Sequence, residues 1–436
     1  MKRVVILGGG FAGLNAAKDL RRARVAVTLV DRHNHHLFQP MLYQVATAAL
    51  SPGDIASPIR SVLRENRNTE VLLDEADRVD LEGRSVHLAS GRVLPYDYLI
   101  IATGARHSYF GRDDWERLAP GLKELEDAFA VRRRILLAFE QAEQEPDPAV
   151  RAALLTFVIV GAGPTGVEVA GALAEIKSYT LERDFRNINP RAAKVIVMEG
   201  GPRVLPSYPA ELSDKARKTL ERLGVDVRTD TMVTDIGPDG VTTKDGQTPA
   251  RTVIWAAGNV ASPLLKTLGI PLDRQGRAPV QPDCSIPGHP EVFILGDAAA
   301  FSDQGRLLPG VCPVAIQMGK YAASVIRQEA AAAKPGPRRP FHYFDKGQLA
   351  VIGRGRAVAD IGRAHFSGFV AWLLWIFVHI FFLIGFRNRI IVLLEWGISY
   401  FTYSRGARLI TYDRPGHVPA GARPVGSQPP TEAALR

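Results

Sequence analysis

Residues 3–20 read RVVILGGGFAGLNAAKDL, and the fold can be inferred from them. After Arg3 comes an apolar run rich in β-branched residues, and residues 3–7, which are too short for a helix, predict a buried parallel strand. A glycine-rich turn follows, and apolar residues then recur at helical spacing up to Leu20. Residues 25–30 form the next apolar strand. This order of strand, helix and strand predicts an α/β fold with a parallel sheet.

The glycine-rich turn is GGGFAG, at residues 8–13. In a motif of this spacing Gly8 permits the tight turn, Gly10 lets the backbone approach a pyrophosphate, and Gly13 lets the helix pack on the strand. The phosphates then lie at the helix N-terminus, where free N–H groups and the helix dipole favour negative charge. Asp31 ends the second strand, where it can accept hydrogen bonds from a ribose diol. The pattern predicts a dinucleotide site, with a purely structural glycine turn as the alternative.

The same unit occurs a second time, with an apolar strand at 156–160 and the turn GAGPTG at 161–166, followed by a helix and another strand. Glu199 ends that later strand, after a polar insertion. A carboxylate there repels a 2′-phosphate and so favours NADH over NADPH, although Arg203 close by weakens this preference. The residues predicted to bind the second dinucleotide are Gly161, Gly163, Pro164, Thr165, Gly166 and Glu199.

Three further segments bear on what the two sites hold: IIATGA at 100–105, TVIWAAG at 252–258 and EVFILGDAA at 291–299. Each alone is explained by a turn at the end of a strand. Their joint order favours a flavin with a nicotinamide over two nicotinamides, and Asp297 would bind the ribityl chain or bridge a phosphate through water. The residues that these segments add to the predicted cofactor sites are Ala102, Thr103, Gly104, Ala257, Gly258, Gly296 and Asp297.

The cysteine content excludes several classes of protein. Cys284 and Cys312 are the two cysteines of the chain, so a disulfide framework and a structural zinc site are excluded, and we predict no metal site. No CxxC or CxxxxC pair is present, which excludes a flavin–dithiol relay. The first strand begins at once, with no apolar signal region before it, so we expect a cytoplasmic origin.

The C-terminal part of the chain has a different character. Residues 369–386, FVAWLLWIFVHIFFLIGF, carry no charge, and a second apolar and aromatic stretch follows at 390–403. The net charge of the chain is +9, and residues 334–414 hold 12 Lys or Arg against 4 Asp or Glu. Aromatic-rich segments flanked by arginines favour helices lying in a membrane interface, over a spanning helix or a buried dimer or core helix. We therefore interpret the positive charge as attraction to anionic lipid and expect no nucleic-acid partner.

Taken together, these motifs resemble the two-dinucleotide-binding-domain flavoproteins, and within them the type II NADH dehydrogenases, which are single-subunit NADH:quinone oxidoreductases. The resemblance covers residues 1–415. It rests on the segments HLFQPMLYQVAT (36–47), GAGPTGVEVAGALAE (161–175), MEGGPRVLP (198–206), PGVCPVAIQMGKYAA (309–323) and FDKGQLAVIGRGRAVAD (344–360).

The resemblance implies roles for individual residues. Glu168 is the main catalytic candidate, facing the flavin and quinone region, and Gln317 is expected near the quinone head group. Lys346 is expected near the flavin ring, where it would help to hold negative charge on the reduced flavin. At Cys312 and Pro313 the chain departs from the family's usual Ala-Gln, which puts the flavin and quinone contacts there in doubt. The other residues expected to hold FAD are Gly8, Gly9, Gly10, Phe11, Ala12, Gly13, Asp31, Arg32, Val79 and Asp297.

The resemblance also implies the organisation of the chain. We expect two Rossmann-like domains, for FAD and NADH, and a C-terminal membrane-anchoring section. Independently of the resemblance, the polar and proline-bearing composition of residues 141–149 predicts a linker between the two copies of the unit. The predicted bounds are 1–115 with 277–335 for the FAD domain, 116–276 for the NADH domain, 336–415 for the anchoring section and 416–436 for a disordered tail.

The implied activity is transfer of hydride from NADH to FAD and of two electrons to a membrane quinone, menaquinone or ubiquinone, without proton pumping. We expect a homodimer at the cytoplasmic face of the cell membrane. The alternatives are a sulfide:quinone oxidoreductase, which needs a redox pair of cysteines beside the flavin, a soluble ferredoxin or rubredoxin reductase, which the apolar C-terminus argues against, and an NADH-sensing flavoprotein without sustained turnover.

Overall fold

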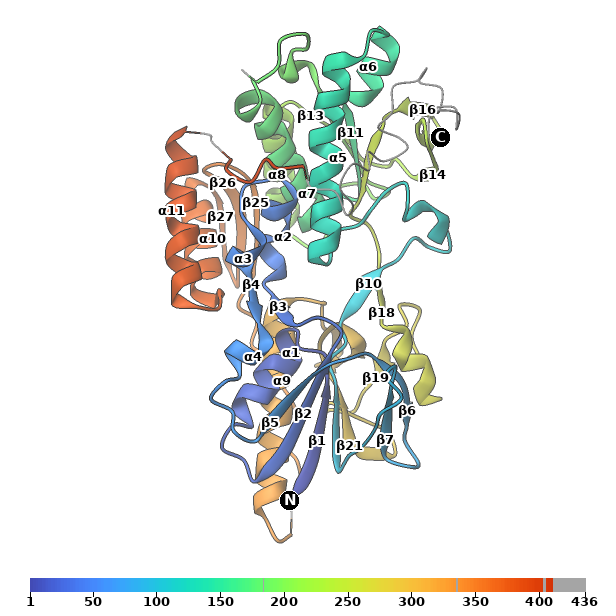
Figure 1. The fold of residues 1–436 in the computed structure, drawn as a ribbon, viewed down its shortest axis with the longest axis vertical. Helices are drawn as coiled ribbons and strands as arrows, with labels where there is room; N and C mark the ends of the chain where they lie inside the picture. The colour runs from blue at the N-terminus through green and yellow to red at the C-terminus, as the bar shows by residue number, and fades with distance from the viewer. Residues whose placement is uncertain (183, 335, 403–404, 411–436) are drawn as a thin grey trace, which may run out of the picture. The chain divides into compact units, whose positions relative to one another are not determined.

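The computed structural model describes residues 1–182, 184–334, 336–402 and 405–410, so the predicted tail at 416–436 lies outside the described residues. The chain divides into two compact units (Figure 1). Unit 1 consists of Met1–Phe38, Ala56–Ser108 and Gly258–Lys346, and unit 2 of Gln39–Ile55, Tyr109–Ala257 and Gly347–Arg436. Residues 39–55 belong to unit 2 and residues 258–276 to unit 1. The predicted FAD domain instead includes 39–55, and the predicted NADH domain includes 258–276. The domain bounds stay a prediction.

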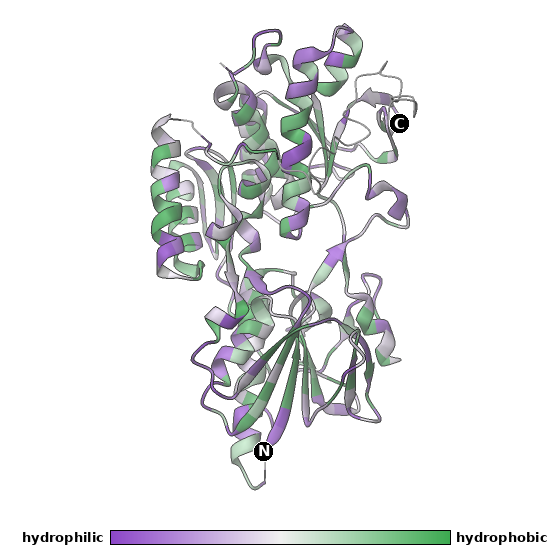
Figure 2. Cartoon of the chain, in the orientation of Figure 1, coloured by the Kyte–Doolittle hydropathy of each residue, from purple (hydrophilic) through white to green (hydrophobic). Residues whose placement is uncertain are grey.

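Unit 1 is built on a six-stranded sheet with the order β20-β21-β9-β1-β2-β5. The five strands from β21 to β5 are parallel, and β20 pairs antiparallel with β21. After the charged Lys2 and Arg3 at its start, β1 is apolar and buried, as β9 is throughout (Figure 2), because a parallel sheet is covered on both faces. The strands predicted at 3–7 and 25–30 are confirmed as β1 and β2. The bounds are β1 Lys2–Leu7, β2 Val25–Asp31, β5 Thr69–Leu73, β9 Tyr98–Ile101, β20 Ser285–Ile286 and β21 His289–Ile294.

Helices α1 (Phe11–Asp19) and α9 (Cys312–Ala331) pack against each other in unit 1. Smaller elements complete this unit around the ends of the sheet. They are β3 His35–Leu37, β4 Ala56–Pro58, α4 Ile59–Val62, β6 Ala76–Asp80, β7 Ser85–Leu88, β8 Val93–Pro95, β10 Ala105–His107, β18 Asn259–Ala261, η5 Pro263–Leu268, β19 Ala278–Pro279, η6 Gly296–Ala298, β22 Ala299–Ala300, β23 Ser302–Asp303 and β24 Arg306–Leu307.

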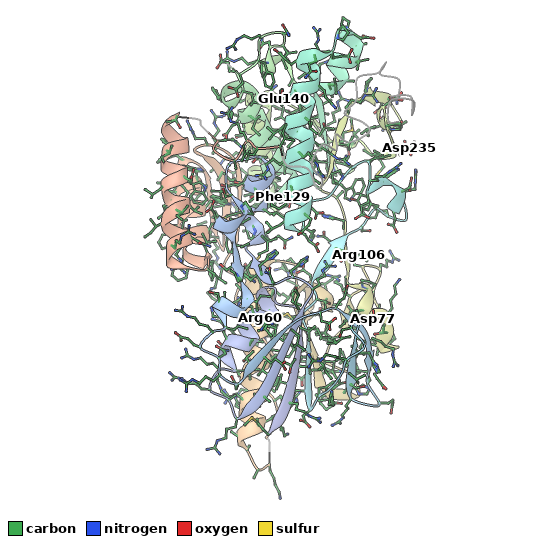
Figure 3. All side chains as sticks on the ribbon, viewed as in Figure 1. Arg60, Asp77, Arg106, Phe129, Glu140 and Asp235 are labelled. Carbon is green, nitrogen blue, oxygen red and sulfur yellow. The ribbon has the colours of Figure 1, made fainter. Side chains whose placement is uncertain are left out.

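Unit 2 repeats the architecture on a parallel four-stranded sheet with the order β13-β12-β11-β17. A small antiparallel sheet of β14, β15 and β16 adjoins it, and Arg112 Nη2 donates to Asp235 Oδ1 of β14 at 2.9 Å (Figure 3 labels Asp235). The strand bounds are β11 Thr156–Val160, β12 Lys194–Met198, β13 Val225–Arg228, β14 Val233–Gly237, β15 Gly240–Thr243, β16 Gly246–Pro249 and β17 Thr252–Trp255. The helices are η1 Gln39–Met41, α2 Leu42–Ala46, α3 Pro52–Ile55, η2 Asp113–Trp115, α5 Leu125–Gln144, α6 Pro148–Leu154, α7 Pro164–Glu175, η3 Ile176–Thr180, η4 Pro190–Ala192 and α8 Ala210–Arg222.

The sequence analysis predicted that the polar residues 141–149 are a linker between the two copies of the unit, and this prediction is wrong. Helix α5 continues to Gln144, with Phe129 and Glu140 along it (Figure 3), and α6 begins at Pro148. Asp147 caps α6 by accepting the backbone N–H of Ala149 at 2.7 Å. All of these residues belong to unit 2, so the proline and the acidic residues mark a helix cap inside one unit.

The C-terminal part of unit 2 is an antiparallel sheet of β25 (Gln348–Gly353), β26 (Arg356–Ile361) and β27 (Ala364–Gly368). Helix α10 (Phe369–Phe382) packs on this sheet, and α11 (Phe386–Thr402) contacts α10 and α3. The two helices and the sheet form one layered block in Figure 1.

The uncharged stretch at 369–386 is divided between two helices. Leu383 is extended and Gly385 has a φ of +91°, so the first helix stops there. Arg389 caps the end of α10, because its Nε donates to Leu383 O at 2.7 Å and its Nη2 to Phe381 O at 2.9 Å. Among the described residues, none of the helices has the length and apolarity needed to cross a bilayer.

Candidate active site

The first glycine turn has the geometry that its spacing predicts. Gly8 has a φ of +100°, and its N–H donates to Val30 O at 2.8 Å. A Cβ on Gly13 would lie 1.9 Å from Gly8 O, so only glycine lets α1 approach the turn this closely. A Cβ on Gly10 would meet nothing within 4 Å, and Gly10, the N-cap of α1, makes no side-chain cap. The helix N-terminus therefore faces open space with uncapped N–H groups.

Asp31 lies beside this turn at the end of β2. One carboxylate oxygen accepts the N–H of Gly9 at 2.5 Å, and the other accepts the N–H of His33 at 2.7 Å. Arg32, which follows, is exposed. The carboxylate is thus held by backbone donors next to the helix N-terminus.

The sequence interpretation missed His36, which also belongs to the turn. Its Nδ1 lies 3.0 Å from Gly9 O, so Nδ1 carries the proton and donates it. Burial lowers the pKa of His36, which keeps the ring neutral. Its ring packs edge-on against Phe11 with centroids 5.0 Å apart. His36 is one of three histidines in the polar run DRHNHH (31–36), and nothing in the sequence distinguishes it from the other two.

Other predicted residues of unit 1 surround the same turn. A Cβ on Gly8 would lie 2.4 Å from the carbonyl oxygen of Ala102. Thr103 Oγ1 is buried and has no hydrogen-bond partner among the described residues. Asp297 lies on η6 with its carboxylate against Gly310, where a Cβ would be 3.1 Å away. Gly104 and Gly296 both have positive φ, of +65° and +64°.

Four further predicted residues belong to unit 1. The N–H of Val79 donates to Thr267 Oγ1 at 3.2 Å. Lys346 is exposed. Cys312 and Pro313 form the first turn of α9, where a proline is well accommodated.

Gln317 is engaged with the backbone in both directions. Its Nε2 donates to Phe344 O at 2.9 Å, and its Oε1 accepts the N–H of Phe344 at 3.0 Å. The Gln317 amide therefore holds the backbone of Phe344, two residues before Lys346, in place. The sequence did not indicate this contact.

The second glycine turn, in unit 2, repeats the first. Gly161 has a φ of +100°, and its N–H donates to Met198 O at 2.8 Å. A Cβ on Gly166 would lie 2.0 Å from Gly161 O, while one on Gly163 would meet nothing within 4 Å. Pro164 and Thr165 begin α7. The two turns share their backbone conformation, their strand anchor and their open N-terminus.

Glu199 occupies the place in unit 2 that Asp31 has in unit 1. One of its oxygens accepts the N–H of Ala162 at 2.7 Å and the other that of Gly201 at 2.8 Å. Arg203 donates to Pro206 O at 3.1 Å. Ala257 packs against the core around Trp255, and Gly258, with a φ of +74°, begins the next segment of unit 1.

Glu168 lies in the first turns of α7. Its side chain is partly accessible but densely surrounded by protein, and this desolvation raises the pKa of its carboxyl well above the usual value. The N–H of Val351 on β25 donates to the carboxylate and partly opposes this rise. A carboxyl with a raised pKa can give up a proton at pH values where an ordinary glutamate has already lost its own.

Tyr43 and Gln44, which the sequence interpretation did not assign, lie near this carboxyl. Both are buried on α2, which contacts α7. Gln44 Nε2 donates to Tyr43 Oη at 3.0 Å, and Trp396 Nε1 on α11 donates to Gln44 Oε1 at 2.7 Å. Desolvation raises the pKa of Tyr43, with a further contribution from Glu168, so the phenol stays neutral.

A buried ion pair also contributes to this region. Arg405 donates to Glu175 Oε2 at 3.2 Å, to Thr47 O at 2.8 Å and to Ala172 O at 3.3 Å. It therefore ties the last described segment of the chain to α7 and to the end of α2.

Unit 1 fits a bound FAD on three observations. The space in front of Gly10 is open to a pyrophosphate, Thr103 Oγ1 is a buried polar atom without a partner in the described part of the chain, and Asp31 is fixed at the strand end. These are the features that dinucleotide binding needs at a glycine turn.

Two family models match the chain. The pyridine nucleotide-disulphide oxidoreductase model matches residues 2–319, and the NDH2 C-terminal domain model matches residues 346–405.

Two curated relatives come from Mycobacterium tuberculosis. The type II NADH:quinone oxidoreductase Ndh is 49% identical over 94% of this chain and 90% of its own length. The type II NADH:quinone oxidoreductase NdhA is 46% identical over 94% of this chain and 89% of its own length. Among solved structures, NDH2 from Plasmodium falciparum in complex with NADH has the same fold, with a TM-score of 0.84 at 20% identity over 93% of this chain and 99% of that one.

Proposed function

This chain belongs to the type II NADH:quinone oxidoreductases, and on that premise we propose which of its residues serve each part of the reaction. When bound, FAD takes a hydride from NADH and passes two electrons to a quinone, without proton pumping. The observation that carries the assignment is the pair of matching glycine turns, one in each unit, together with a desolvated carboxyl of raised pKa at Glu168.

Unit 1 binds FAD through the first turn. The N–H groups at the start of α1 receive the pyrophosphate in front of Gly10, and Asp31 accepts the ribose hydroxyls. His36 keeps the turn in place through its bond to Gly9 O. Thr103, Asp297, Cys312, Pro313 and Lys346 complete the flavin contacts, and Val79 contacts the adenine through its backbone.

Unit 2 binds NADH through the second turn in the same way. Gly163 leaves room for the pyrophosphate, and Glu199 accepts the ribose hydroxyls from a position that two backbone N–H groups fix. A fixed carboxylate there repels a 2′-phosphate, which is the basis of a preference for NADH. Gly161, Pro164, Thr165, Gly166, Ala257 and Gly258 shape this site.

Glu168 supplies a proton for quinone reduction. A quinone that takes up two electrons also takes up two protons to become a hydroquinone, so the site needs a proton donor away from bulk water. Desolvation keeps Glu168 protonated at pH values where an exposed glutamate has lost its proton. Gln317 supports the same reaction by holding the segment that carries Lys346.

The C-terminal helices attach the protein to the membrane surface. Exposed apolar side chains cover α10 and α11, and Figure 2 shows polar residues interspersed among them. Arg363 and Arg387, which flank α10, are exposed and suited to anionic lipid head groups. We place the protein at the cytoplasmic face of the membrane, as a homodimer, with menaquinone or ubiquinone as the oxidant. The exposed apolar residues are Phe369, Val370, Leu373, Phe377, Phe381, Ile390, Leu393, Leu394 and Ile398.

The rival sulfide:quinone oxidoreductase is less supported. It needs a reactive cysteine pair, but Cys284 is fully buried and burial raises the pKa of its thiol well above the usual value, which suppresses the thiolate.

The test is anaerobic reduction of the purified flavoprotein by NADH, followed by addition of a short-chain quinone. We expect rapid bleaching of the flavin and then full reoxidation, repeated over many turnovers. Bleaching without reoxidation by any quinone would remove the proposal in favour of an NADH-sensing protein. Glu168→Gln and Gln317→Ala should slow reoxidation more than reduction.

A further inference from the structure

A chain of hydrogen bonds joins helix α11 to a buried phenol. Trp396 Nε1 lies 2.7 Å from Gln44 Oε1, and Gln44 Nε2 lies 3.0 Å from Tyr43 Oη. All three residues belong to unit 2, although 352 positions separate Gln44 from Trp396.

The chemistry of these groups gives the chain a direction. An indole N–H can only donate, so the oxygen of the Gln44 amide must face Trp396. The NH₂ of that amide therefore faces Tyr43, and the tyrosine hydroxyl must accept from it. A hydroxyl has a single proton, so the proton of Tyr43 points away from Gln44. Trp396 thus fixes, through Gln44, the direction in which the Tyr43 hydroxyl donates.

The surroundings of Tyr43 keep this proton on the oxygen. The residue is 8% exposed, and this burial is the main cause that raises the pKa of the phenol. Glu168, once ionised, and Glu175 add to the rise, while the hydrogen bond from Gln44 and the charge of Arg405 act in the other direction. The result is a neutral O–H donor in the same electrostatic environment as the candidate proton donor Glu168.

Helix α11 is held in the orientation that this chain requires. Leu394 and Ile398 lie two positions before and after Trp396, which places them on roughly the opposite side of the helix. They are 60% and 57% exposed, while Trp396 is partly buried. The helix that presents apolar side chains outward therefore presents the indole N–H inward, to Gln44.

Another buried donor lies beside Trp396. The ring of Trp375 is 5.2 Å from that of Trp396, centroid to centroid, and its Nε1 has no acceptor within the described ranges of the chain. Buried donors without acceptors are rare, so this indole N–H has room for an acceptor such as an ordered water or a ligand oxygen.

We propose that Tyr43 donates a hydrogen bond to a carbonyl oxygen of the quinone head group, and that Gln44 and Trp396 are positioning residues that aim this donor. The proposal rests on the proposed quinone reductase function and deepens it. Tyr43 keeps its proton throughout; its hydrogen bond stabilises the negative charge that develops on the quinone oxygen as electrons arrive, while the two protons of the hydroquinone come from Glu168 and from solvent.

The experiment measures the two half-reactions of the holoenzyme separately, by stopped flow. Flavin reduction by NADH should be unchanged in every variant. Reoxidation by a short-chain quinone should slow about tenfold in Tyr43→Phe and about threefold in Trp396→Phe, because the first removes the donor and the second only its orientation. The double variant should match Tyr43→Phe alone, because Trp396 acts through that hydroxyl.

Trp372→Phe is the matched control, since Trp372 packs against Tyr400 with the ring centroids 5.4 Å apart and is not part of the chain of hydrogen bonds. It should reoxidise at the wild-type rate. If Tyr43→Phe does not retain flavin, Gln44→Met tests the same hydrogen-bond chain. It should slow reoxidation as much as Trp396→Phe does, and combining these two substitutions should slow it no further.

Three outcomes are distinguishable. A wild-type rate in Tyr43→Phe overturns the donor role. Losses that multiply in the double variant overturn the positioning role of Trp396. A wild-type protein that no quinone reoxidises overturns the proposed function itself, before any variant is compared.

Discussion

Arg405 and Glu175 form an ion pair across 3.2 Å, with side chains that are 7% and 16% exposed. The arginine also donates to two backbone carbonyls, and the N–H of Arg354 donates to the other carboxylate oxygen. Four segments of the chain therefore meet at one ion pair in unit 2. Burying charges is costly unless their partners are all present, so the pair makes this region sensitive to loss of either member.

Arg405→Met should lower the free energy of unfolding by about 3 kcal/mol, because it leaves Glu175 buried without its counter-charge. Urea titration monitored by tryptophan fluorescence measures this. The double variant Arg405→Met with Glu175→Leu should recover much of the loss. Lys215→Met, which breaks the exposed pair with Glu211, is the control and should cost no more than about 0.5 kcal/mol. Equal costs at the two pairs would contradict the role assigned to burial.

The two classes of glycine in the turns should respond differently to alanine. Gly13→Ala places a Cβ 1.9 Å from Gly8 O and should reduce both the melting temperature and the flavin content. Gly10→Ala has free space for the methyl group and should leave the fold intact while it weakens FAD binding, because the methyl group occupies the place of the pyrophosphate. Gly163→Ala is the mirror control in unit 2, with full flavin content and a raised KM for NADH. Normal flavin content in Gly10→Ala would argue against this site.

Glu168 should make the protein less stable as the pH rises. Its pKa in the folded protein lies above the value of about 4.5 that it has when unfolded, so the folded state holds the proton more tightly. Stability from this group is complete below pH 4.5 and is lost as the pH rises through the raised pKa. Glu168→Gln removes this loss, so the difference in stability between variant and wild type should grow with pH. A difference that does not change from pH 4 to pH 9 is the result that would refute it.

His379 should produce the opposite dependence. Burial lowers its pKa from 6.5 to about 4, so its contribution is present above pH 6.5 and is lost as the pH falls toward 4. The loss amounts to about 3 kcal/mol at the acid end. The ring stacks on Trp375 at 4.1 Å, so unfolding by denaturant at a series of pH values can be followed by tryptophan fluorescence. His379→Phe should remove the acid sensitivity, and His365→Gln, at a more exposed site, should preserve it.

The glycine turns show how far the sequence reaches. Gly8, Gly13 and Asp31 carry out their geometric parts within one strand–turn–helix–strand unit, so their spacing alone predicts where the backbone must bend and where an acid must stand. The second unit repeats this with Gly161, Gly166 and Glu199. Strand positions were predictable for the same reason, because a buried parallel strand leaves a short apolar run.

At residues 141–149 the prediction from the sequence was wrong, and at residues 369–386 it was incomplete. The polar composition of the first range suggested a linker, but Asp147 is a helix cap. The second range reads as one apolar stretch, yet it breaks at Gly385 because a backbone turn and the capping Arg389 end the helix. The composition of a segment does not indicate which polar group will donate a hydrogen bond to a given backbone carbonyl.

The pair of nucleotide-binding turns, the acids that follow them and the apolar, basic character of the C-terminal section could all be predicted from the sequence, because each depends on neighbours a few positions away. The contacts of Trp396 with Gln44, of Arg405 with Glu175 and of Gln317 with Phe344 became known from the folded chain. A hydrogen bond needs its two groups within about 3 Å. Which distant groups come that close is decided by how helices and sheets pack.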